Sequence, residues 1–295
     1  MSIRTIVVAL ALNGDSACIA NRTIQLAEQH QARLVAVHVI ESLPLRDSSR
    51  PISVDSATFG GALARERACQ LKSLLEAAEQ PVTTCIEEGK PHEIIMGLAA
   101  SCGADLVVIG PGIARSMRES VFGSTADRVV RSSPCPVLVV RKDGNTPYNH
   151  IVVGVDFSEH SKAAASWASR LSPAAYRELV HAIEVPLVFE QAMLKAGTSQ
   201  MEIDHYRKVR VENARRQVIK VFGENVQSSR TIDIKVVHGD AAATLLGLSY
   251  RRAADLLAIG TRGSNALAQH VLGSVARKVL LDASCDVLVV PIAAI

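Results

Sequence analysis

Two groups of glycines near the end of the chain have the spacing of a phosphate-binding loop. Gly260 and Gly263 follow an apolar run that ends at Ile259, and nine residues separate Gly263 from Gly273, which directly precedes Ser274. Glycines after a strand allow positive φ and close approach of the backbone, so their N–H groups can converge on an anion, and a serine adds a hydroxyl. The spacing predicts a cradle for nucleotide phosphates. An ordinary tight turn between a strand and a helix is the structural alternative.

The chain contains this pattern twice. Segments 105–110, 123–124 and 135–140 match segments 255–260, 273–274 and 285–290 at an offset of 150 residues. Upstream, 6–10 matches 151–155 at an offset of 145 and 38–41 matches 181–184 at an offset of 143, so the extra length of the second copy falls between its second and third strands. Such a repeat indicates a tandem duplication. A polar, turn-rich joint at 142–149 leads us to expect domains at residues 1–143 and 149–295.

Within each copy, short runs of Val, Ile and Leu alternate with longer amphipathic stretches. This alternation is typical of a parallel sheet that helices bury on both faces. We therefore predict an α/β fold of two tandem, doubly wound, Rossmann-like domains. The first copy should have strands at 4–10, 33–39, 82–87, 105–109 and 137–141, helices at 16–30, 62–80 and 92–102, and a loop at 42–58. The second copy should have matching helices at 161–171, 200–222 and 241–252.

One carboxylate is placed to join the glycine loop. In such sheets ligands bind beyond the carboxyl ends of the strands, where the strand order reverses, with phosphate at a helix N-terminus. Asp156 follows strand one of the second copy and should therefore lie at the same edge as Gly260 and Gly273. It could accept from ribose hydroxyls or hold a divalent cation. Alternatively, it caps the helix whose first turn would be 157–159.

The second copy resembles a known family in four segments. These are Val153–Ser158, His181–Glu184, the glycine pattern from Gly260 to Ser274, and Val287–Val290. They are similar to the universal stress proteins in their tandem form, and the resemblance covers nearly the whole sequence. It implies an adenine nucleotide α-hydrolase-like fold with ATP bound between strand one, strand two and the glycine loop.

The resemblance also implies a role for individual residues. Asp156 would lie by the nucleoside and the metal, the backbone of Ala182 would hold the adenine edge, and the others would shape the loop or contact the phosphates. ATP is the expected ligand, with ADP or AMP as alternatives and with Mg²⁺ carried by the nucleotide; no catalytic residue and no protein metal site are expected. The binding residues implied are Asp156, Ala182, Gly260, Arg262, Gly263, Gly273, Ser274 and Val275.

The first copy departs from the pattern at two places. Ala11 stands at the position of Asp156, and Ile113 replaces the second glycine of the loop, with Gly112 displaced behind Pro111. A β-branched residue resists positive φ, and proline removes an N–H donor. We therefore expect a degraded site in the first copy and one nucleotide per chain.

Two classes of function fit these features. In the first, the protein is an ATP-binding stress-response regulator or sensor, for which the nucleotide is a ligand and not a substrate. In the second, it is a slow ATPase or an adenylyl-transferring enzyme that uses the same site. Phosphoryl transfer needs positioned cations and a group that orients the nucleophile, and the sequence offers only Asp156, Arg262 and Ser274. A third alternative is a structural pair of domains with no ligand.

Composition argues against several other classes. A net charge of +3 and an aromatic content of 3% do not favour nucleic-acid binding. The basic stretch 207–220 fits a surface helix with one packed face, formed by Ile203, Tyr206, Val209 and Val218. No apolar run reaches the roughly 18 residues that span a bilayer. Ile6–Leu12 imitates a secretory segment but recurs as a strand in the second copy, which predicts a cytoplasmic protein.

Cysteines, histidines and edge strands complete the expectations. None of the six cysteines has metal-binding spacing, and Cys135 and Cys285 are expected to fill the core. His38 and His181 end the second strand of each copy, where a structural hydrogen bond is favoured over catalysis. The closing strands 137–140 and 287–290 are apolar edges, so we expect an intramolecular pseudo-dimer, with a homodimer of chains as a further option.

Overall fold

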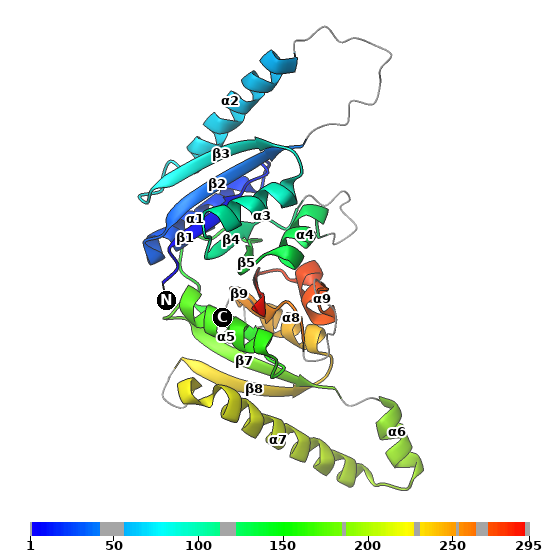
Figure 1. The fold of residues 1–295 in the computed structure, drawn as a ribbon. Helices are drawn as coiled ribbons and strands as arrows, with labels where there is room; N and C mark the ends of the chain where they lie inside the picture. The colour runs from blue at the N-terminus through cyan, green and yellow to red at the C-terminus, as the bar shows by residue number, and fades with distance from the viewer. Residues whose placement is uncertain are drawn as a thin grey trace, which may run out of the picture. The chain divides into compact units, whose positions relative to one another are not determined.

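The chain divides into two compact units. The computed structural model describes residues 2–41, 56–112, 122–184, 187–226, 231–251, 254–263 and 271–292. Unit 1 comprises Met1–Pro147 and unit 2 comprises Tyr148–Ile295 (Figure 1).

Unit 1 is a parallel sheet with helices between its strands. Hydrogen-bonded neighbours follow the order β3-β2-β1-β4-β5, so the first strand is central and the strand order reverses between β1 and β4. The segment Ile6–Leu12 that imitates a secretory leader thus contributes to the central strand. The elements are β1 (Thr5–Ala9), α1 (Ser16–His30), β2 (Arg33–Ile40), α2 (Ser56–Leu74), β3 (Val82–Glu88), α3 (Pro91–Ser101), β4 (Leu106–Ile109), α4 (Ser124–Ser132) and β5 (Val137–Val139).

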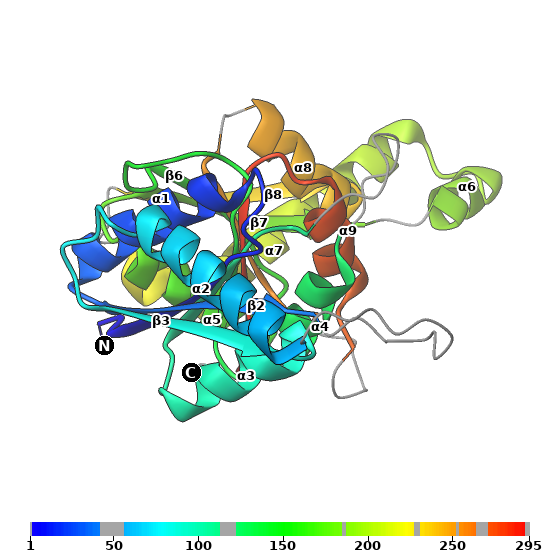
Figure 2. The same cartoon turned by 90° about the horizontal axis from the view of Figure 1, so that it is seen from above.

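Unit 2 repeats this topology. Its strands follow the order β10-β9-β6-β7-β8, again parallel, with the reversal between β6 and β9. Figure 1 shows α7 along β8, and α6 projects away from the sheet in both views (Figures 1 and 2). The elements are β6 (His150–Gly154), α5 (Glu159–Leu171), β7 (Tyr176–Ile183), α6 (Leu187–Lys195), α7 (Gln200–Val226), β8 (Ile232–His238), α8 (Ala241–Arg251), β9 (Leu256–Gly260), α9 (Ser274–Asp282) and β10 (Asp286–Val290).

The strands form the core of each unit. Every residue of β4 and of β10 is buried, as expected for strands with helices on both faces. The loops that enter the central strands are held in the same way in both units. Asp105 Oδ2 accepts from the N–H groups of Arg4 and Thr5 at 2.8 and 3.0 Å, and Asp255 Oδ2 accepts from those of Asn149 and His150 at 2.8 and 3.0 Å. The predicted α/β fold of two tandem copies is confirmed.

Three local predictions need correction. Helix α2 begins at Ser56, so the predicted loop 42–58 is helical at its end, and the part before Ser56 lies outside the described residues. Helix α6 was not predicted. On the basic helix, Ile203 and Val218 are buried, but Val209 is 42% exposed and does not belong to the packed face. Among the described helices, none has the length and apolar character to cross a membrane.

The cysteine prediction is confirmed for the two core positions. Cys135 and Cys285 are both buried. Burial raises the pKa of the Cys135 thiol to about 11, so this thiol is protonated at neutral pH. A protonated, buried thiol is a poor nucleophile, which is consistent with a packing role.

Candidate functional site

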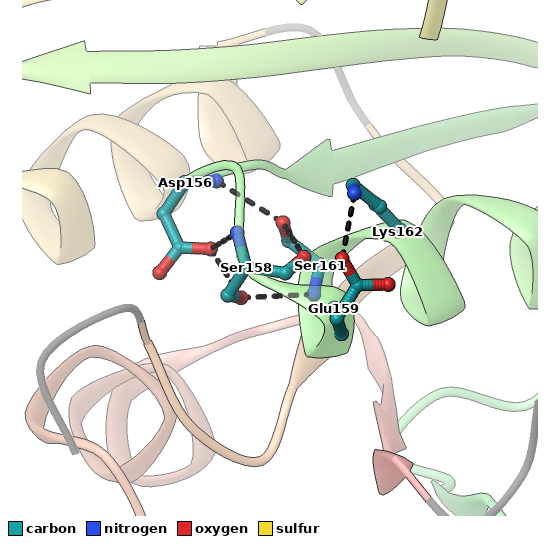
Figure 3. Close-up of polar contacts among 5 residues, drawn as sticks. All are labelled: Asp156, Ser158, Glu159, Ser161 and Lys162. Carbon is teal, nitrogen blue, oxygen red and sulfur yellow. Dashed lines mark hydrogen bonds and ion pairs between the residues drawn. The ribbon is translucent and has the colours of Figure 1, made fainter. Parts of the chain in front are cut away.

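The exit of the central strand of unit 2 is a hydrogen-bonded turn that fixes Asp156. Oδ1 of Asp156 accepts from the backbone N–H of Ser158 at 3.1 Å and from its hydroxyl at 2.5 Å (Figure 3). Ser158 in turn is the N-cap of α5, because its Oγ accepts from the N–H of Ser161 at 3.2 Å. Asp156 is therefore not the helix cap that the sequence offered as an alternative. It orders the turn that precedes the cap.

The backbone of this turn is tied down as well. The N–H of Asp156 donates to Ser161 Oγ at 3.3 Å, and that hydroxyl donates to the Ser158 carbonyl at 2.9 Å (Figure 3). Both ends of the turn are thus anchored to the first turn of α5. The Asp156 carboxylate is held in one position before any ligand arrives, which reduces the entropy that a ligand must remove.

Asp156 and the glycine loop meet at the strand-order reversal. A Cβ atom placed on Gly263 would lie 2.7 Å from Oδ2 of Asp156, closer than side-chain atoms can approach. A side chain at this position would therefore force Oδ2 of Asp156 or the loop to move. The structure brings together the two predicted site residues that are far apart in the sequence.

The second half of the loop leads into a helix. The N–H of Gly273 donates to the carbonyl of Thr261 at 2.9 Å and closes the loop. Gly273 is the N-cap of α9 and provides no side-chain cap, so the first N–H groups of α9, including those of Ser274 and Val275, have no partner from the cap residue. These N–H groups and the helix dipole form an electropositive end at the predicted phosphate position.

Close packing, and not a left-handed backbone, explains the glycines of this loop. Gly260, Gly263 and Gly273 are absent from the positive-φ glycines of the described chain. A Cβ on Gly260 would lie 2.6 Å from the Cβ of His160 in the first turn of α5. Of the two reasons that the sequence suggested, positive φ is wrong for these three residues, whereas close approach is confirmed. Glycine here lets α5 and Asp156 come close to the loop.

Two ionisable side chains besides Asp156, those of His160 and Arg262, lie at the loop. Burial lowers the pKa of His160, nearby Arg262 lowers it further, and Asp156 opposes the shift. His160 is therefore uncharged over more of the neutral pH range than an exposed histidine. Arg262 is half-buried and contributes a permanent positive charge where phosphates are expected.

The end of strand two offers backbone groups at the same edge. The ladder between β6 and β7 ends at the pair Gly154 and Val180, whereas the ladder between β7 and β8 continues to Ile183. Within the described residues, the β6-facing edge of Ala182 thus has no strand beside it. This main-chain edge is the one to which the resemblance assigns the adenine base.

The two strand-end histidines have the structural role that the sequence favoured. Nδ1 of His181 donates to the carbonyl of Val155 at 2.8 Å, and Nδ1 of His38 donates to the carbonyl of Leu10 at 2.8 Å. Each bond ties strand two to the exit of strand one. The same bond in both units indicates a feature of the fold and not of catalysis. His270, within the glycine pattern, lies outside the described residues.

The loop of unit 1 closes more tightly. The N–H of Gly123 donates to the carbonyl of Pro111 at 2.8 Å, which matches the hydrogen bond from Gly273 to Thr261 in unit 2. However, a Cβ on Gly123 would lie 2.9 Å from the Cα of Gly112, whereas a Cβ on Gly273 would lie 3.5 Å from the Cα of Arg262. Gly112 has φ +90°, which permits this closer approach. With Ala11 in place of the carboxylate, unit 1 lacks the arrangement seen in unit 2; Ile113 lies outside the described residues.

Sequence reasoning missed Ser158 and Ser161, although their spacing carried a signal. A serine followed three residues later by a polar residue is a helix N-terminus pattern. We expect Ser158→Ala to destabilise unit 2 by about 1 kcal/mol, because the N-cap is lost. Urea unfolding followed by Trp167, the single tryptophan of the chain, measures this change within α5.

A matched control for Ser158→Ala lies in the same helix. Ser169 donates its hydroxyl to Ala165 at 3.1 Å in the helix interior, where the backbone is already bonded. Ser169→Ala should leave the unfolding midpoint nearly unchanged. Equal losses for both serines would contradict the capping role.

Comparison with known proteins agrees with the two-copy fold. The family model described as "Universal stress protein family" matches residues 2–141 and again 147–291. A universal stress protein of Methanocaldococcus jannaschii is 32% identical over 126 residues, which cover 42% of this chain and 73% of that protein.

Solved structures match over the whole chain. A universal stress protein from Archaeoglobus fulgidus aligns with a TM-score of 0.69 at 16% identity and covers 97% of this chain and 98% of its own. A putative universal stress protein from Pseudomonas aeruginosa aligns with a TM-score of 0.66 at 19% identity, over 99% of this chain and 95% of its own. At such identities the likeness shows the fold alone. Because the family model covers nearly all of both units, the chain belongs to the universal stress protein family, with two copies of the domain in tandem.

Proposed function

We propose that this protein is an ATP-binding stress-response regulator that holds one adenine nucleotide in unit 2. The observation that carries the proposal is the approach of Asp156 to Gly263. A fixed carboxylate and a glycine of the loop meet where the strand order reverses. Unit 1 has alanine in place of that carboxylate and a tighter loop.

The described residues fit a nucleotide part by part. The N-terminus of α9 and Arg262 suit the phosphates, Asp156 suits the ribose hydroxyls, and the edge of Ala182 suits the base. The resemblance also puts Asp156 near a metal, but the described residues contain no group of three or more side chains that could hold one. Any Mg²⁺ would therefore arrive with the phosphates. ADP and AMP would use the same contacts with fewer phosphates.

A regulatory ligand fits the site better than a substrate. Phosphoryl transfer needs a group that orients the attacking nucleophile as well as cations on the phosphates. The described loop provides Arg262 and helix N–H groups, whereas the Asp156 carboxylate already accepts two hydrogen bonds from Ser158. Bound nucleotide at 100 times its dissociation constant would stabilise unit 2 by about 2.7 kcal/mol. That amount is large against a typical total of about 5–15 kcal/mol.

Incubation with labelled ATP tests the proposal. We expect the purified protein to retain unhydrolysed nucleotide and to turn over no more than about one equivalent per hour, because the described residues of the site offer no group to orient the nucleophile. Asp156→Ala should release the nucleotide. Multiple turnover that Asp156→Ala abolishes would replace the regulator with a slow ATPase or an adenylyl-transferring enzyme.

We also propose a cytoplasmic location. It is supported by the place of β1 at the centre of its sheet, since removal of that segment would leave β2 and β4 without their shared neighbour.

A further inference from the structure

Phe157 has a backbone conformation that phenylalanine rarely adopts. It lies between Asp156 and Ser158 and has φ 67°, in the left-handed region that favours glycine. Leu12 in unit 1 occupies the matching position with φ 54°. The left-handed turn is therefore a property of the strand-one exit in both units. Glycine would adopt this turn at lower conformational cost, so the side chain that each unit carries there is a candidate for a specific function.

The ring of Phe157 lies over the end of strand two. Its centroid is 4.5 Å from that of the His181 ring, with the two planes tilted by 46°. His181 is fixed by its hydrogen bond to Val155 at 2.8 Å and directly precedes Ala182. Phe157 is only half-buried and directly follows Asp156 in the chain. The ring thus belongs to the residue next to the carboxylate that suits the ribose, and it contacts the histidine that precedes the backbone edge that suits the base.

We propose that Phe157 is a specificity-determining residue whose ring forms the wall against which the purine of the bound nucleotide stacks. This inference rests on the proposed function of unit 2. Aromatic side chains bind bases through their faces, and a larger purine gains more from the contact than a pyrimidine. Leu12 gives unit 1 an aliphatic side chain at the same turn, which cannot stack. The two units therefore differ in base recognition as well as in the carboxylate.

Two substitutions separate stacking from simple space filling. Phe157→Leu copies unit 1, where a leucine tolerates the same backbone, and should weaken ATP binding about 10-fold. Binding of CTP should weaken less, and binding of inorganic tripolyphosphate should stay unchanged. Phe157→Tyr keeps the ring and should restore ATP affinity. A residue that only packs against His181 would not discriminate between these three ligands.

Fluorescence-monitored titrations of the full chain provide the test. Leu12→Phe in unit 1 is the matched control and should leave the affinities of unit 2 unchanged. Equal loss of ATP and tripolyphosphate binding in Phe157→Leu, or unchanged ATP binding, would overturn the role of Phe157 while the nucleotide site stands. If the unsubstituted protein binds tripolyphosphate but prefers no base, the stacking role fails. If it binds neither ligand, the proposed function fails together with this inference.

Discussion

Gly263→Ile is expected to remove nucleotide binding from unit 2 and with it the stabilisation by ATP. The substitution places a β-branched side chain where a single Cβ would already lie 2.7 Å from Oδ2 of Asp156. Either the carboxylate or the loop must move, and both belong to the proposed site. At 1 mM ATP and a micromolar dissociation constant, the loss should amount to about 4 kcal/mol of ligand-linked stability. Urea unfolding followed by Trp167, with and without ATP, measures it.

A glycine elsewhere in unit 2 provides the control. Gly247 lies in α8, and a Cβ placed there would meet nothing within 4 Å. Gly247→Ala should keep the full response to ATP and raise the basal stability slightly, since alanine favours the helix. A Gly263→Ile protein that is still stabilised by ATP would show that the loop does not hold the nucleotide.

Lys235→Cys is expected to destabilise unit 2 by about 2 kcal/mol, because it removes a cation from a buried carboxylate. Glu178 in β7 is fully buried, and its Oε1 lies 3.5 Å from Lys235 Nζ on β8. Its Oε2 lies 3.8 Å from His150 Nε2 on β6. Loss of Lys235 leaves the charge of Glu178 with less compensation. Urea unfolding followed by Trp167 measures the change in the free energy of unfolding.

Unit 1 supplies the compensating control. Strand register relates the two units, because Val180 pairs with Lys235 in unit 2 and Val37 pairs with Cys85 in unit 1. The residues of unit 1 that correspond to His150, Glu178 and Lys235 are therefore Thr5, Val35 and Cys85, in that order. The triple variant His150→Thr, Glu178→Val, Lys235→Cys replaces the whole cluster by the set found in unit 1 and should recover most of the lost stability. If Lys235→Cys alone leaves the free energy of unfolding unchanged, Lys235 does not stabilise the buried charge of Glu178.

The repeat made most of the fold predictable. Matching segments fixed two copies of one domain, and the periodicity placed helix 16–30 with the ends that the structure gives. Burial on both faces explains why all of β4 and residues 287–290 of β10 are apolar. Other helix ends were less predictable, and α2 begins six residues earlier than expected. Helix α6 was missed because its nine residues carry no clear periodic pattern.

The sequence predicted which residues lie near the site, but not the contacts that explain why glycine is needed there. The spacing of Gly260, Gly263 and Gly273 marked the loop, yet the need for glycine comes from contacts with His160 and Asp156 that only the fold creates. The left-handed backbone of Phe157 leaves no mark in a sequence, because phenylalanine is not a residue that signals it. Buried Glu178 was likewise hidden, since its partners lie on neighbouring strands.

Equilibrium dialysis of the purified, nucleotide-stripped chain against labelled ATP tests the central claim most directly. One equivalent of ATP should bind per chain. Asp156→Ala should abolish that binding, whereas the control Ala11→Ser in unit 1 should leave it unchanged. Two equivalent sites, or a single site that survives Asp156→Ala, would contradict the assignment of the nucleotide to unit 2.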